Sequence, residues 1–395
     1  IVGLAWIVLG VFCSIPLYLS GHFVSFLDAL FDGVSGITTT GASLIIDLDH
    51  LSYADNTFRF MMHLLGGLGL IVVALSLGVF GKGSGSQLYT SEARSEHVVP
   101  NVIQTTQFIA KVTAIVILVA TVLLTGLLLL QGFEPARAVL QALWVSISGF
   151  VTGGFAPMQQ SILYYHSFVL EIITLILMIL GSISFVVFYE VWKGNTGPFF
   201  RDIETRTMFI WVAVMLGVFV ASLSGSPLFA DIPALLRRGV YMVISAFTTT
   251  GFSVITPNQL MVVLTSGAFL TIALLMAVGG AAGSTSGGIK LYRVGIIAKS
   301  ILQTIKQAVS PNSARVVESY LHVGKRILTP TAVKTAMTIF ILYVVTYVVG
   351  ALVGIAHGYD ATQSIFESIA MTSNGGLITG LATPGMPPTL ELFYI

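Results

Sequence analysis

Four short stretches rich in threonine and glycine interrupt a sequence that is otherwise apolar. Each closes a fourteen-residue segment whose fourth residue is aromatic, whose eighth residue is small and whose last residue is glycine. The segments are residues 28–41, 141–154, 238–251 and 363–376. Threonine and glycine are poor helix formers, so a helix that reaches these positions should end there and leave main-chain carbonyl groups unpaired.

We call the last four residues of each segment (38–41, 151–154, 248–251 and 373–376) the Thr/Gly segments. Inside a membrane, such backbone persists only where it is buried in protein or lines a polar cavity. Carbonyl groups from four segments around one axis would replace the hydration shell of a monovalent cation, whereas a ring of carboxylates would favour divalent ions. The candidate ion-binding residues are Thr39, Thr40, Gly41, Thr152, Gly153, Gly154, Thr249, Thr250, Gly251, Asn374, Gly375 and Gly376.

The four copies differ in regularity. Those ending at Gly41 and Gly251 match best, whereas the fourth reads Ser373-Asn374-Gly375-Gly376. We therefore expect the fourth copy to deviate most in carbonyl geometry. Because the second and fourth copies keep the last glycine but not all the threonines, main-chain carbonyls rather than hydroxyls should line the site.

A second stretch of small residues, Gly279–Gly288, lies in the middle of an apolar span. Ten successive small residues, five of them glycine, should unwind a helix. Placed just inside the four Thr/Gly segments, a movable loop would obstruct ion flow, so we interpret it as a gate; close helix packing by small residues is the alternative. Lys290 either faces an aqueous vestibule or marks the membrane interface. The candidate gate residues are Gly279, Gly280, Gly283, Ser284, Thr285, Ser286, Gly287, Gly288 and Lys290.

Composition places these stretches in a membrane protein. The chain has 395 residues, of which 55% are hydrophobic and 9% charged, and a mean hydropathy of +0.93. Soluble domains carry about 25% charged residues. The sequence shows no nucleophile–base pair, metal-ligand spacing or phosphate-binding loop, so we expect neither an enzyme nor a bound cofactor. We expect the chain to contact membrane lipid and not to bind nucleic acid.

The elements around the Thr/Gly segments recur in one order. A long apolar span is followed by a short helix of about ten residues and then by a returning apolar span; the short helix cannot cross a bilayer, which takes about 20 residues. We expect an all-α integral membrane fold of four tandem helix–pore helix–helix repeats around a central pore. The repeats are 1–106, 107–206, 207–332 and 333–395. The long spans are 1–20, 108–131, 207–229 and 334–356, and the returning spans are 59–80, 168–192 and 260–296.

The chain opens inside an apolar run and stops before any closing span of the fourth repeat. We therefore expect that sequence is missing at both ends. Charge predicts orientation: of the 18 basic residues, 14 lie around 81–111, 193–206 and 290–334. This asymmetry places those loops in the cytoplasm, so the four short helices enter from outside. Their C-terminal ends, each with about half a negative charge, should point at the axis.

Several isolated residues have simpler interpretations. Asp32 and Glu367 occupy the fifth position of the first and fourth segments, and we expect them to accept hydrogen bonds from backbone N–H groups. His63 should be a hydrogen-bonded core residue. Gly66-Gly67-Leu68-Gly69 should allow close packing against a neighbouring pore helix.

The residues 35–41 (Ser-Gly-Ile-Thr-Thr-Thr-Gly), the loop 283–290 (Gly-Ser-Thr-Ser-Gly-Gly-Ile-Lys) and the stretch 87–94 with Pro100 and Thr105 resemble the Trk/Ktr/HKT superfamily of potassium transporters, in particular its bacterial TrkH subunits. This resemblance implies potassium uptake across a bacterial or archaeal cytoplasmic membrane. In plant relatives, serine at the first filter glycine accompanies sodium selectivity; Gly41 therefore favours potassium as the transported ion. The resemblance also implies a filter at the four glycines and a gate within 279–290.

The same resemblance implies a homodimer and a cytoplasmic, nucleotide-binding regulatory subunit (TrkA-like) that contacts the basic loops. The family's arginine in the last returning span has no counterpart here. A rival hypothesis is a secondary transporter of a small solute with 279–288 as its substrate site. Such folds usually contain two inverted repeats, whereas these four copies share one orientation. The coupling ion and the regulating nucleotide stay open.

Overall fold

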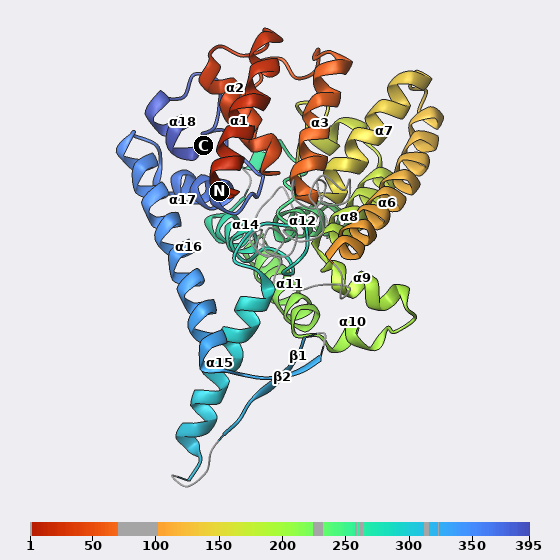
Figure 1. The fold of residues 1–395 in the computed structure, drawn as a ribbon. Coiled ribbons are helices and arrows are strands. Elements are labelled where there is room, and N and C mark those ends of the chain that lie inside the picture. The colour runs from red at the N-terminus through yellow and green to blue at the C-terminus, as the bar shows by residue number, and fades with distance from the viewer. Residues whose placement is uncertain are drawn as a thin grey trace.

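The computed structural model describes residues 2–69, 102–223, 232–256, 259–260, 264–311, 316–322 and 324–395 (Figure 1). The described chain is almost wholly helical, which confirms the all-α membrane fold class. The basic residues Lys82, Arg94 and Arg315, and the whole stretch 87–100, lie outside the described residues.

Three of the described helices are long and apolar enough to cross a membrane. These are α6 (Val102–Leu130), α11 (Ile203–Leu223) and α16 (Pro330–Ala356). The paired helices α8 (Phe168–Ser182) and α9 (Phe185–Trp192) pass the same test together, although the pair is bent by 98°. A shorter apolar helix, α1 (Val2–Leu19), occupies the place of the first long span.

Four amphipathic helices precede the Thr/Gly segments. They are α2 (Phe26–Ile37), α7 (Pro135–Phe150), α12 (Ile232–Phe247) and α17 (Ala361–Thr372). All four end at the tenth position of the fourteen-residue segment, immediately before the Thr/Gly residues. Helices α7 and α12 have 16 residues, longer than expected; at about 1.5 Å per residue they still span less than a bilayer.

Each returning helix packs against the short helix of the next repeat. Helix α3 (Tyr53–Leu68) packs on α7, α8 packs on α12, and α14 (Ser266–Val278) packs on α17. A short helix, α18 (Pro388–Tyr394), closes the circle by packing on α2. It follows the fourth Thr/Gly segment, at the place in the repeat where the other three copies have a returning helix. The described part of the first returning span ends at Gly69, so its predicted extension to residue 80 lies outside the described residues.

The second returning span, predicted over 168–192, is not one straight helix, because the chain bends between α8 and α9. At the bend, main-chain groups pair with residues of the 279–290 loop. Ala281 N–H donates to the Ser182 carbonyl at 3.0 Å, and Phe185 N–H donates to the Gly283 carbonyl at 3.2 Å. The inserted loop thus replaces the helical hydrogen bonds that the bend removes.

The third returning span is interrupted as its composition suggested. Helix α14 ends at Val278, and α15 (Leu291–Val309) begins after the 279–290 loop. Helix α15 extends to the lower end of the molecule in Figure 1, where the short helix α10 (Gly197–Arg201) and a hairpin also lie. The hairpin pairs β1 (Ser319–His322) antiparallel with β2 (Gly324–Ile327). The sequence analysis did not anticipate these strands.

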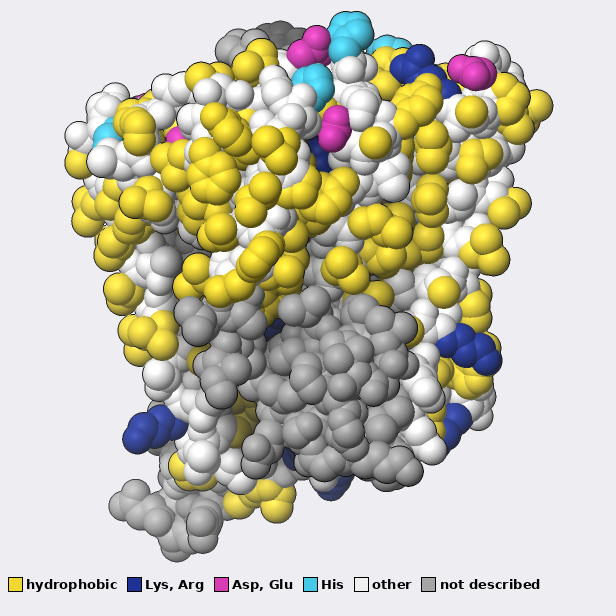
Figure 2. Space-filling view, turned by 45° about the horizontal axis from the view of Figure 1, so that its top comes forward, with side chains coloured by type: hydrophobic (Ala, Val, Ile, Leu, Met, Phe, Trp, Pro, Cys, Tyr) yellow, Lys and Arg dark blue, Asp and Glu magenta, His cyan; other side chains and the backbone are white. Residues whose placement is uncertain are grey.

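Figure 2 shows a broad band of hydrophobic side chains on one face of the molecule. Acidic and histidine side chains on this face gather toward its upper rim, where lysine and arginine side chains also lie, and other lysine and arginine side chains stand below the band. Exposed apolar residues of α16, including Ile341, Leu342, Val345 and Leu352, belong to the lipid-facing surface that a membrane helix needs.

Candidate functional site

The four Thr/Gly segments adopt the same main-chain turn. In every copy the N–H of the thirteenth residue donates to the carbonyl of the eighth residue, at 2.7 to 3.0 Å. The pairs are Thr40 to Ser35, Gly153 to Ser148, Thr250 to Ser245 and Gly375 to Ala370. This turn is the same in all four copies, because main-chain groups form it. The fourth copy deviates in carbonyl geometry as predicted: Gly376 has a φ of 59° against 83° to 88° for the other last glycines, and the Gly375 carbonyl accepts a hydrogen bond of 2.7 Å from Leu377 N–H.

The backbone angles repeat as well. The twelfth residue has a positive φ of 51° to 59° in every copy, and the last glycine has a positive φ of 59° to 88°. The twelfth residues are Thr39, Thr152, Thr249 and Asn374. A β-branched residue in this region costs about 1–3 kcal/mol of strain, which persists only where the surrounding structure imposes it. Such strain concentrates at functional sites.

The last glycines form a closed ring, which we call the glycine ring (Gly41, Gly154, Gly251 and Gly376). A Cβ on Gly41 would lie 2.3 Å from the Gly153 carbonyl oxygen, and one on Gly154 would lie 2.1 Å from that of Thr250. A Cβ on Gly251 would lie 2.6 Å from the Gly376 Cα. A Cβ on Gly376 would lie 2.7 Å from the Thr40 carbonyl oxygen. Each glycine thus leaves room for the main chain of the next copy.

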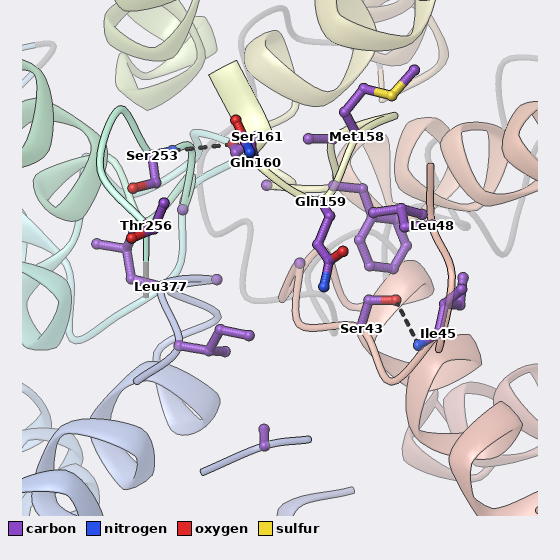
Figure 3. A pocket seen from close by; sticks show the side chains of 18 of the residues that line it. Ser43, Ile45, Leu48, Met158, Gln159, Gln160, Ser161, Ser253, Thr256 and Leu377 are labelled. Atoms are coloured by element: carbon purple, nitrogen blue, oxygen red, sulfur yellow. Dashed lines mark hydrogen bonds between the residues drawn. The ribbon is translucent and has the colours of Figure 1, made fainter. Parts of the chain in front are cut away.

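A cavity of about 470 Å³ opens on one side of the ring, and all four ring glycines line it. We call it the outer cavity, since it lies on the side predicted to face outward. Figure 3 shows it between the chains that follow the Thr/Gly segments, with the Gln159 side chain extending into the space. The hydroxyl of Ser161 accepts a hydrogen bond from Ser253 N–H at 3.1 Å, which joins the second and third copies.

A second cavity, of about 530 Å³, lies toward α15, and we call it the inner cavity. Thr38, Thr39 and Asn374 line it from the Thr/Gly segments. Residues 282–286 line it from the 279–290 loop, together with Gly288 and Lys290. Of these two cavities, the outer one is bordered by the glycine ring and the inner one by the loop.

The 279–290 loop contacts the Thr/Gly segments directly. Gly287 N–H donates to the Thr249 hydroxyl at 2.7 Å, and the Thr152 hydroxyl donates to that of Thr285 at 3.1 Å. A Cβ on Gly287 would lie 2.0 Å from the Ser373 carbonyl oxygen. The loop therefore touches the second, third and fourth copies.

The loop is also held from behind. The Thr285 hydroxyl lies 2.9 Å from the Gly181 carbonyl and 3.1 Å from the Phe150 carbonyl. Glu204, at the start of α11, accepts a hydrogen bond of 2.6 Å from Ala282 N–H. Within the loop, the Ser286 hydroxyl accepts from Gly280 N–H and pairs with Ser284. The glycines at 279, 283 and 288 have positive φ values of 68°, 73° and 79°, so the loop conformation requires them.

Lys290 lines the inner cavity, and its ammonium group donates to the Ser286 carbonyl. This position favours the first of the two interpretations of Lys290, in which the side chain faces an aqueous vestibule. Its own positive φ of 82° turns the chain back toward the loop, which brings the side chain inward.

The sequence predicted hydrogen-bond partners for three buried polar residues near the ring, and the structure agrees with these predictions in part. Glu367 accepts hydrogen bonds from Thr379 N–H at 3.0 Å and Ala382 N–H at 3.1 Å, as predicted. Asp32 instead forms a fully buried ion pair with Arg59, at 3.2 Å. His63 has no hydrogen-bond partner for either ring nitrogen within the described residues, contrary to the prediction. It stacks on Phe155, with ring centroids 4.1 Å apart.

Glycines of the returning helices pack closely behind the ring, as predicted. A Cβ on Gly66 would lie 1.8 Å from the Ile37 carbonyl oxygen, and one on Gly67 would lie 2.5 Å from the Val151 Cβ. A Cβ on Gly181 would lie 2.0 Å from the Phe150 carbonyl oxygen. These contacts bring the main chain of the returning helices against the ends of α2 and α7.

Sequence reasoning missed the contacts made by Arg59, Glu204 and Tyr347. The Tyr347 hydroxyl lies 2.7 Å from the Ser373 hydroxyl and donates to the Ala277 carbonyl at 3.3 Å. It thereby connects the fourth Thr/Gly segment to the end of α14. The sequence offered one signal for Arg59 and Glu204, namely a charged residue within or next to an apolar span.

Comparisons with known proteins agree with this arrangement. A family model described as TrkH, cation transport protein, matches residues 1–392. An uncharacterized cation transporter of Methanocaldococcus jannaschii is 31% identical over 97% of this chain and 75% of its own length. The Trk system potassium uptake protein TrkH of Vibrio parahaemolyticus is 31% identical over 95% of this chain and 75% of its own.

The fold agrees with a solved structure. The crystal structure of the potassium transporter TrkH from Vibrio parahaemolyticus superimposes with a TM-score of 0.79 at 23% identity. The match covers all of this chain and 80% of that one. The family model matches nearly the whole chain, and the arrangement of helices agrees with that of the solved structure. The chain therefore belongs to the TrkH family of cation transport proteins.

Proposed function

We propose that this chain conducts potassium ions into the cell, through the axis of the glycine ring. The observation that carries the proposal is the ring itself, in which four copies of one strained turn bring carbonyl oxygens against the glycines of their neighbours. Neutral carbonyl oxygens suit a dehydrated monovalent cation. The relative from Vibrio parahaemolyticus, described as a Trk system potassium uptake protein, supports potassium as the ion.

The proposed filter residues are those predicted from the sequence, with the carbonyl groups of the thirteenth position as the central ligands. These are the carbonyls of Thr40, Gly153, Thr250 and Gly375. Their own N–H groups are engaged in the shared turn. Each oxygen lies 2.1 to 3.0 Å from a Cβ placed on a ring glycine: Gly153 at Gly41, Thr250 at Gly154, Gly375 at Gly251 and Thr40 at Gly376. The proposed filter thus uses carbonyls whose orientation the turn determines.

We further propose that the 279–290 loop is the gate. It stands beside the inner cavity and is hydrogen-bonded to the second and third Thr/Gly segments, so it occupies the exit from the ring. Opening would break a small number of hydrogen bonds, each worth about 1 kcal/mol. Its glycines allow that backbone change, because they adopt angles that other residues avoid.

The repeats at 1–106, 107–206, 207–332 and 333–395 would each supply one quarter of the pore. A bacterial or archaeal cytoplasmic membrane is the proposed location, with the basic end in the cytoplasm. The apolar face of α16 suits a homodimer or lipid. The exposed strand β2, with Lys325 and Arg326, suits a cytoplasmic regulatory subunit that binds nucleotide.

A solute transporter with its substrate site at 279–288 receives less support. The N–H groups of Ala281, Thr285 and Gly287 already donate to other parts of the chain. A carboxylate substrate would have to displace these bonds before binding.

The test is ion flux into proteoliposomes that contain the full-length protein. We expect uptake of rubidium, a potassium analogue, to exceed that of sodium and to be inhibited by excess potassium. Equal rubidium and sodium uptake would contradict the assignment of potassium. Uptake of a labelled organic solute with no cation uptake would favour the solute transporter.

A further inference from the structure

A buried cluster of three metal-ligating side chains lies at the cytoplasmic end, apart from the glycine ring. It comprises Asp202 and Glu204, at the start of α11, and His322, at the end of β1. Their exposed fractions are 2%, 3% and 4%. One candidate ligand atom from each residue lies within 4.8 Å of the other two. Segments 120 residues apart thus converge on one buried point.

The spacing fits a metal ion after a small movement. His322 Nδ1 lies 3.1 Å from Asp202 Oδ2, and two ligands on one zinc ion, each at about 2.1 Å, stand roughly 3.4 Å apart in tetrahedral geometry. The ligand atoms all lie within 4.8 Å of one another, so no pair must shorten by more than about 1.4 Å. A small rotation of the Glu204 carboxylate can supply that change, because a carboxylate can bind a metal ion through either oxygen.

Neighbouring groups hold the three side chains in place. The His322 ring packs against that of Tyr292, with centroids 4.7 Å apart, and Tyr292 pairs with Tyr320 through their hydroxyls at 3.0 Å. Asp202 Oδ1 accepts a hydrogen bond of 2.8 Å from Glu204 N–H. Such supporting contacts orient metal ligands and raise the affinity of a site.

We propose that Asp202, Glu204 and His322 bind one divalent transition-metal ion of the zinc class. An imidazole nitrogen with two carboxylates favours this class over magnesium and calcium, which prefer oxygen ligands alone. The metal would take the place of the proton between His322 Nδ1 and Asp202, because both atoms must offer lone pairs; in the neutral imidazole that proton moves to Nε2. Water can complete the coordination.

The site adjoins the proposed gate. Glu204 Oε1 accepts a hydrogen bond from Ala282 N–H, at the middle of the 279–290 loop. A metal ion that holds Glu204 would hold this loop in the observed position and would tie it to the cytoplasmic hairpin. Bound metal therefore lowers cation flux, and this second part rests on the proposed function.

The binding test uses the metal-stripped full-length protein in detergent and Zn²⁺ as the probe. Calorimetry on the wild type should give one site per chain. His322→Gln and Asp202→Asn should each weaken binding more than about tenfold, a loss that substitutions even outside the first coordination sphere can cause. His357→Gln is the matched control, since His357 is exposed and distant in sequence from the cluster.

Equal Zn²⁺ affinity in His322→Gln and His357→Gln would overturn the site, as would the absence of a one-to-one site in the wild type. Either result would mean that the cluster is only a hydrogen-bonded contact. If His322→Gln and Asp202→Asn do not fold, the visible spectrum of Co²⁺ on the wild type decides, because a histidine-ligated tetrahedral ion gives strong bands and a surface ion does not.

The coupling test measures rubidium flux with and without Zn²⁺ on the cytoplasmic side. Wild-type flux should fall, and flux through Glu204→Gln should be much less sensitive; the amide oxygen of that variant can still accept from Ala282 N–H. Metal binding without a change in flux would overturn the coupling but not the site. Absence of any cation flux in metal-free protein would instead count against the proposed function.

Discussion

The side-chain amide of Asn374 donates a hydrogen bond of 2.7 Å to the main-chain carbonyl of Thr38, which joins the fourth Thr/Gly segment to the first across 336 residues of sequence. Asn374 stands at the position that threonine occupies in the other three copies. Its positive φ of 54° is tolerated well by asparagine. The substitution that made the fourth copy look irregular therefore provides a contact between copies.

Loss of this contact should loosen the fourth copy. Asn374→Gly keeps the positive φ accessible but removes the amide, so we expect a loss of about 1 kcal/mol in the free energy of unfolding. We also expect a lower ratio of rubidium to sodium flux, measured in proteoliposomes. Asn195→Gly removes an exposed amide whose contact is local, to Glu190, and serves as the control. An unchanged flux ratio in Asn374→Gly would show that this bond does not shape the proposed filter.

The glycine ring should not tolerate side chains. Gly41→Ser and Gly251→Ser place a Cβ 2.3 Å from the Gly153 carbonyl oxygen and 2.6 Å from the Gly376 Cα, so the neighbouring main chain must move. We expect a lower rubidium-to-sodium ratio in both variants. Gly385→Ser is a matched control, because Gly385 has a similar φ of +87° but no neighbour within 4 Å of an added Cβ. Equal effects of all three substitutions would trace the change to backbone strain rather than to ring crowding.

Release of the 279–290 loop should raise basal flux. Thr249→Val removes the hydroxyl that accepts from Gly287 N–H, and Thr285→Val removes contacts to the Gly181 and Phe150 carbonyls. The loss of one bond, worth about 1 kcal/mol, would raise the population of the open loop roughly fivefold. Deletion of residues 281–287 should raise flux further.

Thr304→Val is the control for these gate variants, since that hydroxyl bonds only locally, to the Ser300 carbonyl. Flux at or below the wild-type value in all three loop variants, with normal expression, would favour a packing role for the loop.

The buried Asp32–Arg59 pair should be a stability determinant beside the outer cavity. Both side chains are fully buried, and Arg59 also donates to the Ser43 hydroxyl at 3.1 Å and lies over the Phe155 ring. Arg59→Met would leave the Asp32 carboxylate without its counter-charge, so we expect a loss of about 3–5 kcal/mol. Thermal unfolding in detergent measures this.

The double variant Asp32→Asn/Arg59→Met removes both charges and should lose less stability than Arg59→Met alone. A double variant that loses the sum of the two single losses would indicate that the two residues act independently.

The sequence by itself determined the membrane class, the four copies of the Thr/Gly segment and the break at 279–290. These features depend on local composition: apolar runs set the spans, and runs of threonine and glycine favour helix ends. The ends of α2, α7, α12 and α17, all at the tenth position of the segment, follow from that local chemistry.

Only the tertiary structure decided how the copies meet. The order of the glycine ring, the bond from Asn374 to Thr38 and the contact of Thr285 with Thr152 join residues far apart in sequence. The bend between α8 and α9 likewise depends on the loop that pairs with it. Local propensity carries no information about such partners, because a hydrogen bond or close main-chain approach is specified by both surfaces together.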